Sequence, residues 1–262
     1  MNYLDRATPF FGDEGFAILK EKTISFAGLG GVGGGAFLAL VRCGASSFRL
    51  AENGVFDPPD MNRQAGAFGN TMDRPKLDVY VELARSINPD IKLETYPDGI
   101  HANNLDAFLT NSDAFIAVID VEKGEDVKSM TPAMLEKHQI PAFTCGAIGF
   151  GALMVNYAPD GMKEDTFWKL AKENDSGGGL LPSAMQQNFS AQAMDRMKQG
   201  LAKGILPTTA IGGLASNVLL ANEVLAYLLA DTGLVEREPV FAPNYVTLDF
   251  MTQNMRVADV TK

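Results

Sequence analysis

A glycine-rich turn near the start of the chain is the first stretch whose residue types suggest ligand binding. Residues 28–33 read GLGGVG and stand between an apolar strand pattern and a helical pattern. In such a turn Gly28 permits a tight bend, Gly30 lets the backbone approach a phosphate, and Gly33 lets the helix pack closely on the strand. The start of the helix also offers free N–H groups to an anion. We therefore predict that a nucleotide phosphate binds here.

A carboxylate at the end of the second predicted strand would complete a nucleoside site. Glu52 lies at that position, where it can accept hydrogen bonds from both ribose hydroxyls. The pattern does not distinguish NAD from another ligand that carries adenosine and phosphates. A glycine-rich strand–helix turn can also occur without any ligand. The choice between these alternatives depends on the residues downstream.

A second polar cluster follows in the next loop. The segment DMNRQ contains Asp60, Asn62, Arg63 and Gln64, and Lys76 follows at the start of a predicted helix. A triphosphate carries about four negative charges, and the leaving pyrophosphate must be met by cations placed in advance. A dehydrogenase has no comparable need for Arg and Lys beside the ribose acid. The cluster favours an enzyme that consumes ATP, with an NAD(P)-dependent oxidoreductase as the weaker alternative.

In the order of these motifs the chain resembles the ThiF/MoeB/HesA family, the bacterial relatives of the ubiquitin-activating enzymes. The family pattern is Gly-x-Gly-Gly-x-Gly, an acidic residue, Asn-x-x-Arg-Gln, a lysine and a strand that ends in aspartate. This chain shows GLGGVGG, Glu52, DMNRQ, Lys76 and AVID in the same order. The match covers residues 6–160 well and the last helix and strands more loosely. The resemblance implies that ATP and a carboxylate react to give an acyl-adenylate and pyrophosphate.

The resemblance also implies roles for individual side chains. Arg63 and Lys76 would bind phosphates, and Asp120 would bind a Mg²⁺ ion. Arg6 matches a family arginine that reaches the ATP of a partner subunit, so a homodimer is expected. The residues expected to bind the nucleotide are Gly28, Gly30, Gly31, Gly33, Glu52, Asp60, Asn62, Arg63, Gln64 and Lys76.

The chain departs from the family pattern at two places. Asp60 stands where the family has asparagine, so either Asn62 takes over that contact or the pocket differs. The family's second carboxylate after the fourth strand falls on Lys123, within IDVEKGED. A lysine there would compete with magnesium or contact a phosphate itself. A non-catalytic scaffold with the same fold is therefore a second hypothesis beside the active adenylyltransferase.

The few cysteines and histidines favour adenylation without zinc and without a thioester step. The sequence has no CxxC pair, so no structural zinc is expected. The crossover before the last helix, where thioester-forming relatives carry their catalytic cysteine, contains none. Cys43 and Cys145 lie in a helical and a strand-like pattern, and we interpret both as packing residues. The isolated His101 and His138 are interpreted as surface or packing residues.

Alternating strand and helix patterns must position these residues. They predict a Rossmann-like α/β fold with a mostly parallel sheet flanked by helices and an antiparallel C-terminal extension. A helix after the fourth strand is expected to begin at a Thr131 cap, with Pro132 at its first position. One adenylation domain, residues 1–262, would comprise a nucleotide-binding part (1–160), a flexible crossover loop region over the substrate (161–206) and a C-terminal helix with strands (207–262).

The composition restricts the kinds of partner that the protein is expected to bind. The formal net charge is −10, which disfavours nucleic acid and anionic membrane surfaces. No apolar run reaches the ~18–20 residues of a membrane span, and no signal pattern precedes the fold, so a cytoplasmic location is expected. The expected substrate is the C-terminus of a peptide or of a small ubiquitin-like protein. An acidic surface suits a partner that presents basic residues.

Overall fold

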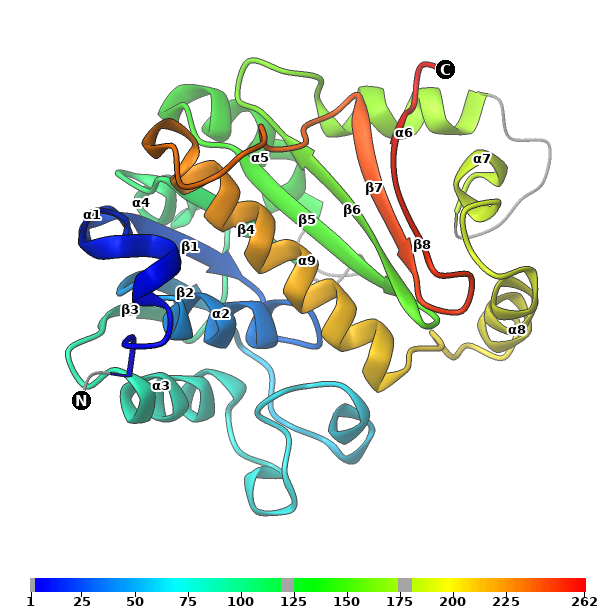
Figure 1. Cartoon of the computed structure of the whole chain (residues 1–262). Helices are drawn as coiled ribbons and strands as arrows, with labels where there is room; N and C mark the ends of the chain where they lie inside the picture. The colour runs from blue at the N-terminus through cyan, green and yellow to red at the C-terminus, as the bar shows by residue number, and fades with distance from the viewer. Residues whose placement is uncertain (1–2, 119–124, 174–180) are drawn as a thin grey trace.

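The fold is built on one eight-stranded sheet (Figure 1). The structure is a computed structural model, and it describes residues 3–118, 125–173 and 181–262. The strand order is β3-β2-β1-β4-β5-β6-β7-β8, with the first five strands parallel and the last three added antiparallel. This confirms the predicted fold class. The strands are β1 (Thr23–Ala27), β2 (Ser47–Ala51), β3 (Lys92–Tyr96), β4 (Ala114–Ala117), β5 (Ala142–Ile148), β6 (Gly151–Tyr157), β7 (Asn244–Asp249) and β8 (Asn254–Asp259).

Helices cover both faces of the sheet, so it carries two hydrophobic cores. Successive strand residues point to opposite faces, and the side chain of Phe26 accordingly packs in one core while its neighbour Ala27 packs in the other. The first core is formed with helices α1 (Thr8–Glu21), α2 (Gly33–Arg42), α3 (Lys76–Ile87) and α9 (Ala210–Leu228). The second is formed with α4 (Leu105–Leu109), α5 (Glu125–His138), α6 (Glu164–Glu173), α7 (Ser183–Gln186) and α8 (Ala191–Leu201).

Three short 3₁₀ helices complete the described elements: η1 (Pro58–Asn62), η2 (Gly69–Thr71) and η3 (Ala230–Thr232). The crossover segment 161–206, expected as a loop region, contains α6, α7 and α8 in its described part. Its glycine run at residues 177–179 lies outside the described residues.

The start of α5 was predicted wrongly. The helix begins at Glu125, so Thr131 and Pro132 lie inside it. The Thr131 hydroxyl does not cap a helix end; it donates to the carbonyl of Val127, 2.7 Å away within the same helix. A threonine hydroxyl inside a helix can bond the carbonyl four residues earlier, so a threonine followed by proline does not identify a helix start by itself.

Helix α9 crosses the sheet on the first core (Figure 1). By length and composition, α9 is the one helix in the described part of the chain that could cross a membrane. The expectation that no apolar run is long enough was therefore wrong. A core helix passes the same test, and 67% of its most apolar window is buried. Its one buried acid, Glu223, accepts hydrogen bonds from the Arg237 guanidinium and from the Val240 N–H.

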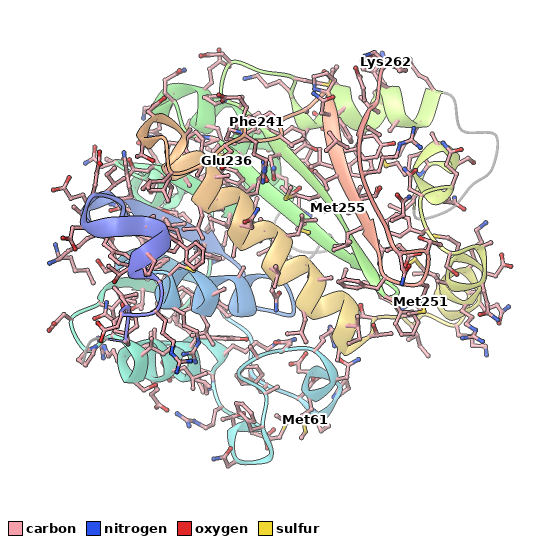
Figure 2. The ribbon with its side chains drawn as sticks, viewed as in Figure 1. Met61, Glu236, Phe241, Met251, Met255 and Lys262 are labelled. Carbon is pink, nitrogen blue, oxygen red and sulfur yellow. The ribbon has the colours of Figure 1, made fainter. Side chains whose placement is uncertain are left out.

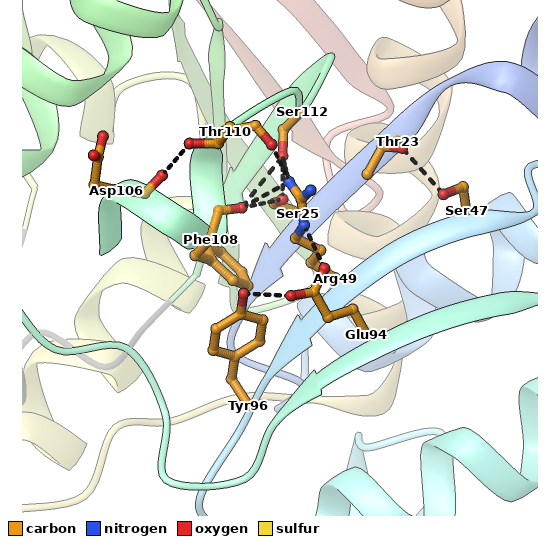
Figure 3. A network of polar contacts seen from close by, with 10 residues as sticks. All are labelled: Thr23, Ser25, Ser47, Arg49, Glu94, Tyr96, Asp106, Phe108, Thr110 and Ser112. Carbon is orange, nitrogen blue, oxygen red and sulfur yellow. Dashed lines mark hydrogen bonds and ion pairs between the residues drawn. The ribbon is translucent and has the colours of Figure 1, made fainter. Parts of the chain in front are cut away.

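A polar network on the other face fastens α4 to the sheet (Figure 3). The Arg49 guanidinium donates to the carbonyls of Phe108 (3.2 Å) and Thr110 (2.6 Å) and to the Ser112 hydroxyl (2.9 Å). Its Nε donates to the Glu94 carboxylate at 2.8 Å. These bonds satisfy the carbonyls at the end of α4, which a helix of this length leaves without partners of its own.

Candidate nucleotide-binding site

A cavity of about 330 Å³ opens at the carboxyl ends of three parallel strands. Ala27 ends β1, Ala51 ends β2, and Val118 follows β4, and all three line it. β1 is flanked by β2 on one side and β4 on the other, so the chain turns in opposite directions from neighbouring strands. In open α/β sheets ligands bind at such a switch point, because the loops diverge there and leave a crevice.

The glycine turn forms the floor of this cavity. Gly28 has a φ of 102° and donates its N–H to the Ala51 carbonyl at 2.9 Å. A Cβ at Gly33 would lie 2.1 Å from the Gly28 carbonyl oxygen, so only glycine lets α2 begin this close to the turn. A Cβ at Gly30 would meet nothing closer than 4.0 Å, because this residue faces open space. The N–H groups of Gly30 and Gly31 have no acceptor among the described residues and are available to an anion.

Glu52 lies at the edge of the cavity and already organises its backbone. Its two carboxylate oxygens accept the N–H groups of Leu29 and Gly54, each at 2.7 Å. A carboxylate has about four acceptor positions, so Glu52 can bind further donors while it holds the turn. The acid predicted to bind ribose therefore also fixes the shape of the glycine loop.

Asp60 is the centre of the polar cluster, although the family pattern has asparagine there. Its side chain is buried and lies 2.9 Å from the Lys76 ammonium. It also accepts from the Gln64 amide, and the Arg63 guanidinium lies 3.9 Å away. The Lys76 ammonium is in turn 5.6 Å from the centroid of the Phe56 ring. Buried charges are tolerated when paired in this way, so Asp60 holds Lys76 at the cavity.

One acceptor in this cluster has no partner. The Oε1 atom of Gln64 is buried and makes no hydrogen bond among the described residues. Such orphaned atoms are rare in native proteins and call for an explanation. Here the orphan lies in a residue that lines a cavity containing Lys76 and Arg63. The donors and cations of this lining fit a nucleoside polyphosphate.

Arg63 and Asn62 connect the cavity to a more distant part of the chain. The Arg63 guanidinium donates to the Pro59 carbonyl (3.1 Å) and to the Asn62 side-chain oxygen (2.9 Å). The Asn62 amide donates to the Thr208 carbonyl just before α9, at 3.1 Å. Asn62 itself does not line the cavity. Its observed contacts position Arg63 and join η1 to the crossover.

The predicted residues therefore divide into three groups. Gly28, Gly30, Gly31, Glu52, Asp60, Arg63, Gln64 and Lys76 line the cavity together. Gly33 and Asn62 lie behind it as supports, and the exposed Arg6 does not line it. Asp120 and Lys123 lie outside the described residues. Within the residues that are described, no group of three or more His, Cys, Asp or Glu side chains could hold a metal ion.

Sequence reasoning missed several contributors to the cavity. His101, interpreted as a surface or packing residue, lines it together with Gly99 and Ile100, and its Nε2 lies 2.8 Å from the Asp98 carbonyl oxygen. These residues follow β3, which ends at the same edge of the sheet as β1 and β2. Because parallel strands end at a common edge, the residues that follow β3 could have been expected to line the cavity.

Asn217, on α9, supports the glycine turn from the far end of the sequence. In the amide orientation that satisfies its contacts, its nitrogen donates to the carbonyls of Gly31 (2.8 Å) and Val32 (2.7 Å). Its amide group also occupies the space where a Cβ at Gly35 would stand. No local pattern in the sequence marks such a long-range contact.

Neither cysteine is placed as a nucleophile in the described structure. Burial raises the pKa of the Cys43 thiol and, more strongly, that of the Cys145 thiol. The reactive form of cysteine is the thiolate, which burial disfavours. Neither side chain lines the nucleotide cavity.

Comparison with known proteins identifies the relatives of this chain. The model of the ThiF family matches residues 4–262. The protein HesA of Nostoc sp. is 34% identical over 105 residues, which are 40% of this chain and 42% of that protein. The tRNA threonylcarbamoyladenosine dehydratase of Escherichia coli is 27% identical over 139 residues, 53% of this chain and 51% of that enzyme. The chain thus spans about half the length, or less, of these relatives.

Solved structures share the fold at low sequence identity. E. coli MccB with MccA superposes with a TM-score of 0.72 at 14% identity, covering 99% of this chain and 71% of that one. E. coli MccB with ATP gives 0.70 at 14% identity, covering 99% and 72%. PaaA gives 0.69 at 16% identity, covering 94% and 75%.

Proposed function

This chain belongs to the ThiF family, and on that premise we propose that it is an ATP- and Mg²⁺-dependent adenylyltransferase that activates a carboxylate. The observation that carries this proposal is the ion pair of the buried Asp60 with the half-buried Lys76, 2.9 Å apart, in the same cavity as the glycine turn and Arg63. Cations held in place beforehand stabilise charge that develops during the reaction, since they need no reorganisation at that moment.

The proposed reaction uses these residues in defined ways. A carboxylate oxygen of the substrate attacks the α-phosphorus of ATP, the bond to the bridging oxygen breaks, and pyrophosphate leaves. The turn N–H groups and the start of α2 bind phosphate oxygens, and Glu52 orients the ribose. Lys76 and Arg63 bind the negative charge that accumulates on the pyrophosphate. Mg²⁺, for which Asp120 is the proposed ligand, would neutralise further phosphate charge.

We further propose that no thioester step follows. The raised pKa values of the Cys43 and Cys145 thiols support this, because both thiols stay protonated near neutral pH. The acyl-adenylate would then pass directly to an amine, a thiol or an internal nucleophile. The substrate would be the C-terminus of a peptide or of a small ubiquitin-like protein, in the cytoplasm where ATP is supplied.

A homodimer is part of the same proposal. Ile211, Leu214 and Val218 lie on one side of α9 at 46%, 57% and 66% exposure, a spacing of three and four residues that forms a continuous apolar stripe. A second copy of the chain would bury this stripe. Light scattering would show a dimer that Leu214→Glu converts to a monomer; the exposed Lys198→Glu should not have that effect.

The central test is pyrophosphate–ATP exchange with candidate carboxylate peptides, accompanied by calorimetric titration with ATP and with NADH. Adenylation predicts exchange that requires the peptide carboxylate and disappears with an amidated peptide. Tight ATP binding without exchange for any peptide would favour the non-catalytic scaffold. Binding of NADH but not of ATP would overturn the proposal in favour of an oxidoreductase.

A further inference from the structure

A second hollow, of about 550 Å³, adjoins the nucleotide cavity. We call it the crossover groove. It lies between η1, the turn that joins β5 to β6, helix α8 and the segment that leads into α9. Arg63 lines both this groove and the nucleotide cavity. A molecule in the groove can therefore reach the predicted phosphate site without leaving the protein surface.

The sides of the crossover groove are apolar and exposed. Ile205, Leu206 and Met251 line it while 59%, 63% and 56% exposed. Met251 lies at the turn between β7 and β8, beside α8 (Figure 2). Exposed apolar side chains gathered around one depression indicate a binding surface, since scattered ones are common but clustered ones are not.

The groove is also firmly built. Asp249, at the end of β7, is buried and accepts the N–H of Ser190 at 2.8 Å and that of Met251 at 3.2 Å. Ser190 caps the start of α8, so one carboxylate fixes two sides of the groove. On the opposite side the Thr209 hydroxyl donates to the Gly149 carbonyl at 2.7 Å and caps α9.

The charge of the groove is opposite to that of the chain. The protein carries a net charge of −10, yet the charged residues that line the groove are two arginines, Arg63 and Arg196, and no acid lines it in the described part of the chain. Arg196 is exposed on α8 and forms no ion pair with a described residue. A site with apolar sides and two arginines complements an apolar ligand that carries negative charge.

We propose that the crossover groove binds the C-terminal segment of the substrate, and that this segment is apolar and acidic rather than basic. Its terminal carboxylate lies at the Arg63 end, beside the nucleotide, and Arg196 pairs with an acidic side chain a few residues before it. Arg196 is thus a specificity-determining residue. This inference rests on the proposed function and names its substrate class: a tail of local acidic character, although the surface of the whole protein suits a basic partner.

The test is selection from a library of random hexapeptides displayed with free carboxyl ends, using the full chain with saturating non-hydrolysable ATP. We expect enrichment of apolar and acidic residues and depletion of lysine and arginine. Arg196→Glu should remove the acidic preference and shift the acidic-to-basic ratio by about three- to ten-fold, since an exposed ion pair has a modest effect. Arg196→Gln should give an intermediate shift.

Lys198→Glu is the matched control. Lys198 is exposed on the same helix and does not line the groove, and its reversal changes the net charge by the same amount. Unselective enrichment by the native chain, or equal shifts in the Arg196 and Lys198 variants, would overturn the inference.

A separate titration with ATP distinguishes the two proposals. If no peptide is enriched while the chain still binds ATP, the proposal for the groove is wrong and the adenylation proposal stands. If peptides are enriched selectively but ATP does not bind, the adenylation proposal is wrong and the groove remains a peptide-binding site.

Discussion

Two polar clusters, one around Arg49 on β2 and one around Asp60 in η1, differ in how completely their hydrogen-bonding groups are satisfied. Around Arg49, one guanidinium meets four acceptors from the chain itself (Figure 3). Around Asp60, a carboxylate and an ammonium pair, but the Oε1 atom of Gln64 is buried without a partner among the described residues. Both clusters combine an arginine, an acid and an uncharged polar group, so residue types alone do not separate them.

The difference indicates what each cluster is for. A satisfied network stabilises the fold, because every group that it removes from water is compensated. A cluster with an orphaned acceptor is destabilised by it until a ligand supplies the missing donor. The Arg49 network therefore holds α4 on the sheet, whereas the Asp60 cluster is arranged to bind. Substitutions in the two clusters should separate stability from activity.

The largest effect should come from Lys76→Ala. Loss of a preorganised cation at the phosphates should lower the rate of pyrophosphate–ATP exchange by roughly a hundred- to a thousand-fold. The same change removes the nearer of the two cations beside the buried Asp60 carboxylate and leaves only the Arg63 guanidinium, 3.9 Å away, which should cost about 3 kcal/mol of stability. The double variant Asp60→Asn with Lys76→Met removes both charges, so it should fold well and remain inactive. Exchange at the native rate in the double variant would exclude the phosphate role.

The second effect should be on stability alone. Arg49→Ala removes four hydrogen bonds and should lower the free energy of unfolding by about 3 kcal/mol, because hydrogen bonds to charged groups are among the stronger ones. Urea denaturation measures it, and ATP affinity of the folded protein should stay unchanged. Arg42→Ala, at an exposed position at the end of α2, should change stability by less than about 0.5 kcal/mol. A loss of ATP affinity in Arg49→Ala would contradict the separation of the two clusters.

A third variant exchanges the orphaned acceptor for an apolar group. Gln64→Met should weaken ATP binding by about ten-fold, the usual effect of one hydrogen bond. It should also lower the stability of the ligand-free protein by about 1–3 kcal/mol, because the Gln64 amide donates to the buried Asp60 carboxylate. Ser112→Ala in the Arg49 network should lower stability by about 1 kcal/mol and leave ATP affinity unchanged. Calorimetric titration with ATP and urea denaturation of both variants would show whether Gln64→Met alone lowers ATP affinity.

The smallest effect should be on the pH dependence of stability that the Glu94 carboxyl in the Arg49 network contributes. Hydrogen bonds from Tyr96 and Arg49 hold the pKa of the Glu94 carboxyl below its ordinary value of 4.5. Because the pKa is lowered in the folded state, the ionised carboxylate stabilises the fold above pH 4.5, and this contribution is lost as the pH falls below it. Thermal unfolding of Glu94→Gln should show less change between pH 6 and pH 4 than the native chain. Equal changes would show that Glu94 is not coupled to folding.

Local patterns sufficed to predict the elements and the glycine turn. The apolar strand and the glycines before α2 predict a strand–turn–helix unit, because the bond from Gly28 to Ala51 and the approach of Gly33 to Gly28 depend on residues near in sequence or one strand away. Residues 141–159 were predicted as a strand pair, and β5 and β6 are indeed antiparallel neighbours. The start of α5 was not predictable in this way, since Thr131 and Pro132 match a cap pattern within the helix.

The sequence by itself determined which side chains carry charge, where the backbone can bend, and in what order strands and helices follow. These properties depend on neighbours along the chain. Only the tertiary structure decided that Asp60 pairs with Lys76, that His101 reaches the cavity and that Asn217 supports the turn from the last helix. It also brought Arg196 and Arg63 into one groove. Such contacts depend on how the sheet and the crossover pack, and a one-dimensional pattern contains no measure of that packing.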